Sequence, residues 1–403
     1  MLAVGGVLSP APAAGQVTVN WAEADGDYGV AANWSPALVP DSPARSAVFN
    51  VDQTFQVEFD QDYTVDSLSV LSGDVTFTPD ATFTADYATV DDVVVEGSTL
   101  RLARVTGPGQ SGRFNLSVGD ELGVAAGGVL EIFDGRTVTT SRLRVGSKNQ
   151  SGLAGQTGTL VVDGPSSSIT TTDPTFVVGV GASFQRGVFR ISNNATADFA
   201  GSLNIGASST SGVRGDVDIL SGSDVSAAGG LKVVNGSGAN QSGDLLIDGA
   251  GTTFTTAGPI EIGVGTGFSS GRVAVRNGAT LTQTGSDGVA IGGPGGGLSQ
   301  VTLESGGTIT TGAGGTAIAA GGRVEIRGGE FIANGGLVAS AGGRLIQQTG
   351  GLLSVVGGLL RPNDGQPDGF FEPLPGVRDY VISGPAGPDA TGPRRTVAVS
   401  CSR

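Results

Sequence analysis

The sequence predicts an all-β chain wound as a parallel β-helix, a β-solenoid with three short strands in each coil of about 21–29 residues. Three observations predict this fold: regularly spaced anchor residues, apolar residues that alternate after each anchor, and a high glycine content. Glycine accounts for 71 of the 403 residues, without the strict three-residue period of collagen. Such a chain consists of many short strands that are separated by glycine turns.

The anchors define the repeat. They are Gly158, Gly187, Gly215, Gly243, Gly271, Ser299, Gly322 and Gly343, at intervals of 29, 28, 28, 28, 28, 23 and 21 residues. Regular self-similarity at this period indicates a stack of units, each of which buries its apolar side against its neighbours. Right-handed winding is the general expectation for parallel crossovers.

Each anchor opens a first strand with two inward columns. The second residue after the anchor is Leu160, Phe189, Val217, Leu245, Val273, Val301, Val324 and Leu345. The fourth is Val162, Ile191, Ile219, Ile247, Val275, Leu303, Ile326 and Gln347, the last of which departs from the pattern. The residues between these columns are mixed in character, as expected of positions that point outward. Alternation with a period of two is the signature of a strand.

Two further strands complete each coil. A second strand carries Ile169, Phe199, Val225, Phe254, Leu281, Ile309 and Phe331, flanked mostly by Thr and Ser. A third strand is expected at 176–179, 203–206, 231–233, 260–263 and 289–292. Stacked parallel pairing satisfies the backbone of every inner coil. At ~4.8 Å per coil, eight coils span on the order of 40 Å.

The repeat shortens at one corner. The connection 264–270 is a Gly/Ser loop, and its counterpart two coils later, 319–321, is only three residues long. The insertions therefore recur at one position and predict a ridge of loops between residues 146 and 300. We expect this ridge or an outer sheet to be the binding face.

The ends of the chain differ from the repeats. Residues 1–14 have the apolar stretch and the small residues of a signal peptide that lacks its positive start, which predicts export. Residues 15–97 are expected to form an N-terminal cap and irregular first coils, 98–360 the regular solenoid, and 361–403 a proline-rich tail or cap. Trp21 and Trp34 supply apolar area for the cap, and the alternative for them is stacking on carbohydrate.

The start of the chain also resembles a known group. Asn20-Trp21, the Ala-Asn-Trp-Ser of 32–35 and Val39-Pro40 precede repeats such as 271–282. Over roughly residues 17–350 the chain resembles bacterial secreted β-strand-repeat proteins, including autotransporter passenger domains. The resemblance implies a surface adhesin or a component of a biofilm or cell envelope, at the cell surface of a Gram-negative bacterium. The implied partners are extracellular glycans, envelope components or further copies of the chain.

Charge and composition exclude several classes of function. The net charge is −15 and the pI near 4.3, so nucleic acid and anionic membranes are unfavourable partners. No apolar run approaches the ~20 residues of a membrane helix. With no histidine and one cysteine, Cys401, the sequence excludes zinc, haem and iron–sulfur sites.

One acidic motif is a candidate calcium site. Glu23, Asp25 and Asp27 are spaced like the first ligands of an oxygen-ligand calcium loop, but the glycine and the twelfth-position carboxylate of that loop are missing. A solvated turn is the alternative. The stretches 60–62 and 91–92 are similar weak sites or ordinary turns. No other cofactor is expected, because the glycine run 292–297 lacks the Lys and Ser/Thr of a phosphate loop.

An enzyme is the alternative function, because pectin-lyase-like β-helices also carry pectate-lyase and polygalacturonase chemistry. Hydrolysis needs two carboxylates that face one cleft, and lyase chemistry needs a base beside bound calcium. The repeats offer acids that look isolated, one per coil: Asp218, Asp248, Glu261, Glu304 and Glu325. We therefore expect a secreted or cell-surface structural and adhesive solenoid without catalysis, with a carbohydrate-active lyase or hydrolase as the alternative.

Overall fold

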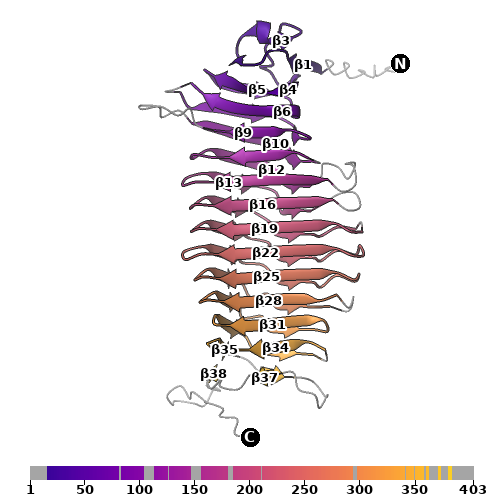
Figure 1. Cartoon of the computed structure of the whole chain (residues 1–403), viewed down its shortest axis with the longest axis vertical. Coiled ribbons are helices and arrows are strands. Elements are labelled where there is room, and N and C mark those ends of the chain that lie inside the picture. The colour runs from indigo at the N-terminus through magenta and orange to yellow at the C-terminus, as the bar shows by residue number, and fades with distance from the viewer. Residues whose placement is uncertain are drawn as a thin grey trace, which may run out of the picture.

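The computed structural model shows one elongated stack of coils, with β1 and β3 at one end and β37 and β38 at the other (Figure 1). It describes residues 16–80, 83–103, 113–125, 127–146, 156–179, 185–209, 211–293, 297–340, 342–348, 350–357, 360–362, 371–373 and 380–383. The predicted signal segment, 1–14, and Cys401 lie outside these residues. Apart from the 3-10 helix η1 (Ala31–Asn33), every regular element described is a strand, which confirms the all-β class.

Three strands make one coil of the regular region, and each pairs in parallel with the equivalent strand of the next coil. The first strands are β13 (Thr157–Asp163), β16 (Arg186–Ser192), β19 (Arg214–Leu220), β22 (Ser242–Asp248), β25 (Ser270–Arg276), β28 (Ser299–Glu304), β31 (Gly322–Arg327), β34 (Arg344–Gln347) and β37 (Phe371–Pro373). The second strands are β14 (Ser168–Thr171), β17 (Thr196–Phe199), β20 (Asp224–Ala227), β23 (Thr253–Thr256), β26 (Thr280–Gln283), β29 (Thr308–Thr311), β32 (Glu330–Asn334), β35 (Leu352–Val356) and β38 (Tyr380–Ser383). The third strands are β15 (Thr175–Val178), β18 (Ser202–Ile205), β21 (Gly230–Val233), β24 (Ile260–Ile262), β27 (Val289–Ile291), β30 (Thr316–Ile318), β33 (Leu337–Ala339) and β36 (Leu360–Pro362).

The stack begins before the first anchor. The strands there are β1 (Val17–Trp21), β2 (Gly26–Asp27), β3 (Trp34–Ser35), β4 (Arg45–Phe59), β5 (Tyr63–Val65), β6 (Leu68–Pro79), β7 (Ala85–Thr89), β8 (Val93–Val95), β9 (Thr99–Leu102), β10 (Phe114–Val124), β11 (Val129–Ile132) and β12 (Thr137–Val145). From β4 onward they pair in parallel with strands one coil away, as β6 does with β9, β9 with β11 and β11 with β13. At the other end, β37 and β38 extend the same pairing into the segment expected as a tail or cap.

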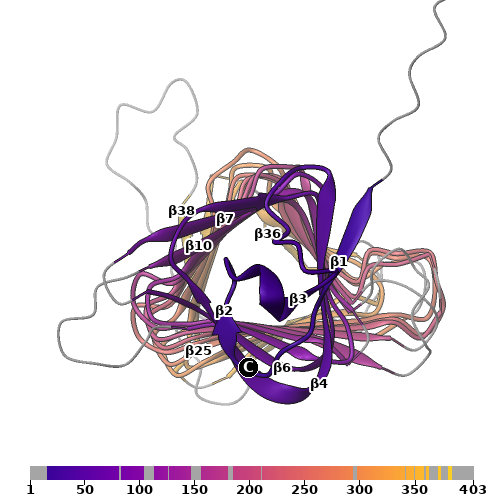
Figure 2. The same ribbon diagram turned by 90° about the horizontal axis from the view of Figure 1, so that it is seen from above.

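The anchors are in register along the stack. Gly158 lies opposite Gly187, Gly187 opposite Gly215, and Gly215 opposite Gly243. Seen along the axis, the strands of successive coils overlie one another around a common interior (Figure 2). The predicted stacking of coils is therefore confirmed.

The two predicted inward columns of the first strand form the core. Every apolar member, from Leu160 and Val162 to Leu345, is at most 2% exposed. Gln347 keeps the inward direction despite its polarity, is fully buried, and donates from Nε2 to Gly351 O at 2.7 Å. Each buried aliphatic side chain contributes about 1.5–3 kcal/mol relative to an exposed one, so these columns supply much of the favourable free energy of folding.

The second strand has two inward columns, and Phe199 lies in a different one from its expected counterparts. Ile169 lies opposite Ala197, and Phe199 lies opposite Thr171. The Phe199 ring packs on Phe176, with ring centroids 4.3 Å apart. The small Ala197 and the large Phe199 therefore share the space that one large residue fills in other coils.

The N-terminal end closes on aromatic side chains. β1 pairs antiparallel with β3, in contrast to the parallel pairing of the coils, and Trp21 lies opposite Trp34. Both indoles are buried, 3% and 2% exposed, and they contact Phe49. Neither ring offers a face for stacking on a carbohydrate. Their position covers the interior of the first coil, as a solenoid end requires.

The connections from third to first strands form the predicted ridge at one corner (Figure 2). Among the described residues, Asn240 N–H donates to Phe268 O at 3.0 Å and Gly212 N–H to Ala239 O at 2.9 Å, so successive loops are bonded to one another. The connection shortens from 263–269, after β24, to 319–321, after β30. The loss of loop residues accounts for the shorter repeat interval.

Candidate functional site

The three predicted calcium ligands do not converge on one point. Glu23 is exposed, and Asp25 Oδ1 accepts a hydrogen bond from Gln56 N–H at 2.7 Å. Asp27 lies in β2, opposite Glu58 of β4. Among the described residues, the carboxylate groups that gather within 4.8 Å of one another lie elsewhere. Calcium binding by Glu23, Asp25 and Asp27 therefore stays a prediction that the geometry does not support.

Asp27 is instead part of an acidic neighbourhood around Glu58. Burial raises the pKa of Glu58, and the negative charges of Asp27, Asp80 and Asp60 raise it further. Asp60 also accepts a hydrogen bond from Tyr63 OH at 2.9 Å. The ionised form of Glu58 is thus disfavoured in the folded chain.

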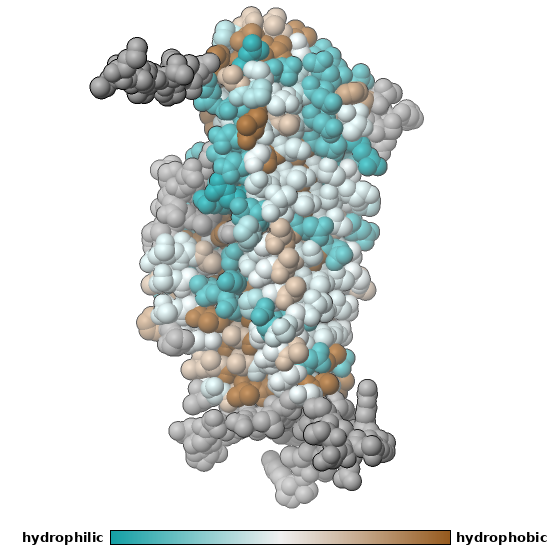
Figure 3. Space-filling model, turned by 180° about the vertical axis from the view of Figure 1, so that it is seen from behind, coloured by the Kyte–Doolittle hydropathy of each residue, from teal (hydrophilic) through white to brown (hydrophobic). Residues whose placement is uncertain are grey.

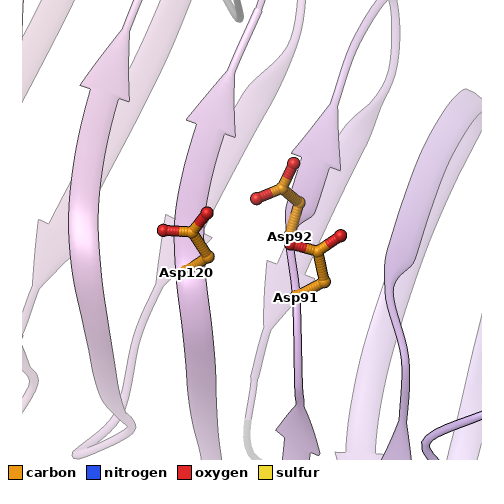
Figure 4. Close-up of side chains that lie close together, drawn as sticks. All are labelled: Asp91, Asp92 and Asp120. Atoms are coloured by element: carbon orange, nitrogen blue, oxygen red, sulfur yellow. The ribbon is translucent and has the colours of Figure 1, made fainter. Parts of the chain in front are cut away.

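Three other carboxylates form a compact group at a corner of the coils. Oxygen atoms of Asp91, Asp92 and Asp120 lie within 4.8 Å of one another (Figure 4). Asp120 follows Asp91 by 29 residues, which is the interval between coils, and its N–H donates to Asp91 O at 3.2 Å. Stacking therefore adds a third acid to the pair noted in the sequence. Carboxylate oxygens suit calcium, although Arg142 Nε donates to Asp120 Oδ1 at 3.0 Å and already neutralises one of them.

The outward side chains of the first strands carry most of the cations. Of the nine Lys and Arg described between residues 156 and 357, eight belong to these strands, and Lys232 lies in β21. The pairs that join neighbouring coils here are Arg186–Asp216, Arg190–Asp218 (3.1 Å), Arg214–Asp244 (3.2 Å), Arg276–Asp248 (2.9 Å) and Arg327–Glu304 (3.3 Å). We call this surface the first-strand face.

These pairs correct the expectation that the acids of the repeats are isolated. Asp218, Asp248 and Glu304 each face an arginine one coil away, and Glu261 lies 3.6 Å from Lys232. Glu325, the fifth of these acids, is not isolated either, because it is fully buried between Arg323 and Arg327 of its own strand. For the other four acids the expectation was wrong because residues 23 to 29 positions apart become neighbours only when the coils stack. Each exposed pair contributes only about 0–1 kcal/mol.

A groove interrupts the first-strand face. It has a volume of about 230 Å³ and is bordered by Asp216, Asp218, Asp244, Leu245, Leu246, Arg272, Val273, Ala274, Gln300 and Thr302. We call it the first-strand groove. The register places Asp216, Asp244, Arg272 and Gln300 in one outward column. Asp218, Leu246, Ala274 and Thr302 form the next. The side of the groove formed by the first column is therefore polar throughout, whereas the side formed by the second column has Leu246 and Ala274 at its centre and is apolar there.

Two of the three acids of the groove, Asp216 and Asp244, share an arginine. Arg214 donates from Nε to Asp216 Oδ1 at 3.0 Å and from Nη2 to Asp244 Oδ2 at 3.2 Å. Burial raises the pKa of Asp244, and the negative charge of Asp216 raises it further. Both acids lie on neighbouring coils, so the structure contains the carboxylate pair that the sequence did not reveal. The signal was present, because the two residues are 28 apart.

The loop ridge carries exposed apolar side chains. Phe268 is 74% exposed and Leu298 77% exposed, on connections one coil apart. The second strands present a different surface, with Thr253, Thr280 and Thr308 in one outward column. The outer surfaces of the solenoid thus differ in chemistry, but on each of them equivalent positions repeat once per coil.

Charge is unevenly distributed along the rod. Residues 1–125 contain 17 Asp and Glu against four Arg, so they hold thirteen of the fifteen net negative charges. In Figure 3, hydrophilic side chains gather towards the N-terminal end, and hydrophobic patches are more frequent towards the other. The acidic character is therefore concentrated in the first third of the molecule.

Comparison with known proteins returns no relative. No family model, no curated protein and no solved structure matches the chain. Within the described residues, no helix has the length and the apolar character needed to span a membrane. The interpretation of function therefore depends on the sequence and on the geometry described above.

Proposed function

We propose that the chain is a secreted or cell-surface β-solenoid that acts as a structural and adhesive element without catalysis. It presents its repeating outer faces to ligands of the envelope, the matrix or a host surface. The observation that carries the proposal is the parallel pairing of successive coils, which runs from β4 to β38 around a continuous apolar core. A rod of this kind holds identical outward positions at a fixed spacing of ~4.8 Å, which favours repeated weak contacts with an extended ligand.

The proposal is tested on the native cells and on the purified chain. We expect antibodies to label the protein on intact cells, and external protease to remove that label. Beads coated with the chain should adhere to the same cells or to their matrix more than beads coated with an acidic control protein do. A chain that stays in the cytoplasmic fraction, or coated beads that adhere no better than the control, contradicts the proposal.

A carbohydrate-active enzyme is the second candidate, and the first-strand groove favours it. Glycoside hydrolysis needs two carboxylates with separated pKa values at one site. Asp216 and Asp244 are adjacent, and the pKa of Asp244 is raised. Incubation with neutral and acidic polysaccharides, followed by assays for reducing ends and unsaturated products, tests this function. Turnover that Asp244→Asn abolishes would establish the enzyme and displace the adhesive proposal.

A further inference from the structure

The first-strand groove has chemistry that the surrounding surface lacks. Ala274 is the smallest side chain of its outward column, where Leu246 precedes it and Thr302 follows. The hollow therefore forms where this side chain is short, opposite Asp244 and Arg272. Four coils border the groove, so it is roughly 14 Å long at ~4.8 Å per coil.

Charge balance selects the class of ligand. The three acids of the groove are already held by arginines of neighbouring positions: Asp216 by Arg186, Asp218 by Arg190, and Asp244 by Arg214. Together with Arg272, four guanidinium groups accompany three carboxylates. A cation therefore finds no excess of negative charge here. An anion beside Arg272 meets Asp244 on the adjacent coil, which opposes binding.

Hydroxyl groups of a ligand match the hydrogen-bond acceptors and donors that Asp244, Arg272 and Gln300 offer in the groove. A carboxylate has about four acceptor sites, and Asp244 accepts the hydrogen bond from Arg214 Nη2 at one of its two oxygens, Oδ2. Arg272 and Gln300 offer N–H donors on the same side. A sugar ring presents both donors and acceptors at its edge and C–H groups on its face. Leu246 and Ala274 provide apolar surface for that face.

We propose that the first-strand groove binds a neutral glycan segment, with a sugar ring held between the Asp244–Arg272 side and the Leu246–Ala274 side. This inference rests on the adhesive function proposed above and names its ligand class and its place. A groove of about 230 Å³ is smaller than the ~300–1,000 Å³ pockets of drug-sized ligands. It therefore holds about one ring at a time, and the affinity per site is low.

The direct test is titration of the full chain with hexasaccharides, followed by calorimetry and ligand-observed NMR. The neutral probes are β-1,4-glucan, β-1,3-glucan and β-1,4-mannan hexamers, and the charged probes are hexagalacturonate and chitosan hexamer. We expect at least one neutral probe to bind with a Kd on the order of 0.1–1 mM, more tightly than either charged probe. Preference for a charged probe, or no binding by any neutral probe, overturns the inference.

Variants then locate the site. Ala274→Leu fills the hollow, and Thr310→Leu makes a similar change on the second-strand surface, where Thr310 lies opposite Thr282. We expect Ala274→Leu to weaken neutral-glycan binding at least tenfold and Thr310→Leu to leave it unchanged. Asp244→Asn keeps the shape and should weaken binding several-fold. Thermal melting of each variant shows whether the fold persists. Binding that survives both groove variants places the glycan elsewhere and overturns the assignment.

The two proposals fail separately. If the groove variants lose glycan binding while coated beads still adhere to cells, the groove is a glycan site but not the adhesive one. If wild-type beads adhere and no neutral probe binds, the adhesive function stands and the glycan inference is wrong.

Discussion

Trp21 and Trp34 meet edge to face in the first coil, with ring centroids 4.9 Å apart and ring planes at 87°. The two indoles differ in one respect. Trp34 Nε1–H donates to Tyr28 O at 2.8 Å, whereas Trp21 Nε1 is buried without a hydrogen-bond partner. Because the two indoles are similarly buried but only one is hydrogen-bonded, substitutions at the two positions isolate the effect of that hydrogen bond.

Trp34→Phe should therefore destabilise the chain more than Trp21→Phe. Both changes remove similar apolar area, but only the first leaves the Tyr28 carbonyl without its donor, which adds about 1–3 kcal/mol. Urea unfolding followed by circular dichroism measures the difference. Equal midpoints for the two variants would show that the bond to Tyr28 contributes nothing.

The inward and outward positions of one strand predict opposite sensitivities. Ile247 is fully buried, and Leu246 beside it points outward. Ile247→Ala should cost about 2–5 kcal/mol, because it removes buried methyl groups and leaves a cavity. Leu246→Ala should cost less than about 1 kcal/mol. The unfolding free energies of both variants check this, and a larger loss for Leu246→Ala would reverse the assignment of faces.

Gly201 permits the close approach of two coils. A Cβ atom at this position would lie 1.6 Å from Pro174 O on the preceding coil. Gly201→Ala should therefore cost about 3 kcal/mol or more, because backbone must move. Gly278 has φ +78°, but a Cβ there would only come into ordinary van der Waals contact with Ala250, whose Cα would lie 3.6 Å away, so Gly278→Ala should cost only about 1–2 kcal/mol. Thermal melting ranks the two, and a milder effect at Gly201 contradicts the packing argument.

Glu58 should make stability depend on pH. Its pKa is raised above 4.5 in the folded chain by burial and by nearby acids, so its ionisation disfavours the fold as pH rises through that value. Glu58→Gln should raise the midpoint temperature at pH 7 by on the order of 1 °C. The gain should vanish at pH values below the pKa that the Glu58 carboxyl group has in the unfolded chain.

The exposed Glu96 provides the control for that change. Glu96→Gln should shift the midpoint temperature less than Glu58→Gln at pH 7. Calorimetry at pH 7 and pH 3 compares both variants with the unchanged chain. A gain for Glu58→Gln that persists at pH 3 would point to a cause other than charge.

The coil architecture was predictable because its signal is periodic. Anchors such as Gly243 and inward residues such as Ile247 recur at a fixed interval, and alternation identifies their faces without any knowledge of distant contacts. Gln347 broke the pattern in composition but not in direction, because the strand geometry around it decides where its side chain points. The recurrence of the anchors and the alternation of apolar residues were therefore sufficient to predict the fold.

The groove and the ion pairs were not predicted, because they depend on register between coils. Asp216, Asp244 and Arg272 each follow an anchor by one residue, so the period places them in one column, but it does not show which outward side chains pair or where a hollow forms. Glu325 was misjudged for a related reason, since Arg323 and Arg327 fold over it from the same strand. Phe199 was assigned beside Ile169, and only strand pairing shows that it aligns with Thr171.

The uneven distribution of charge gives the rod an electric dipole along its axis. When two rods lie side by side in the same direction, their acidic thirds are adjacent and repel. An antiparallel or lengthwise-staggered arrangement separates these thirds and lowers the repulsion. Because the Debye length is only about 8 Å at physiological ionic strength, this orientational preference weakens with salt, and dilute buffer favours opposed neighbours most.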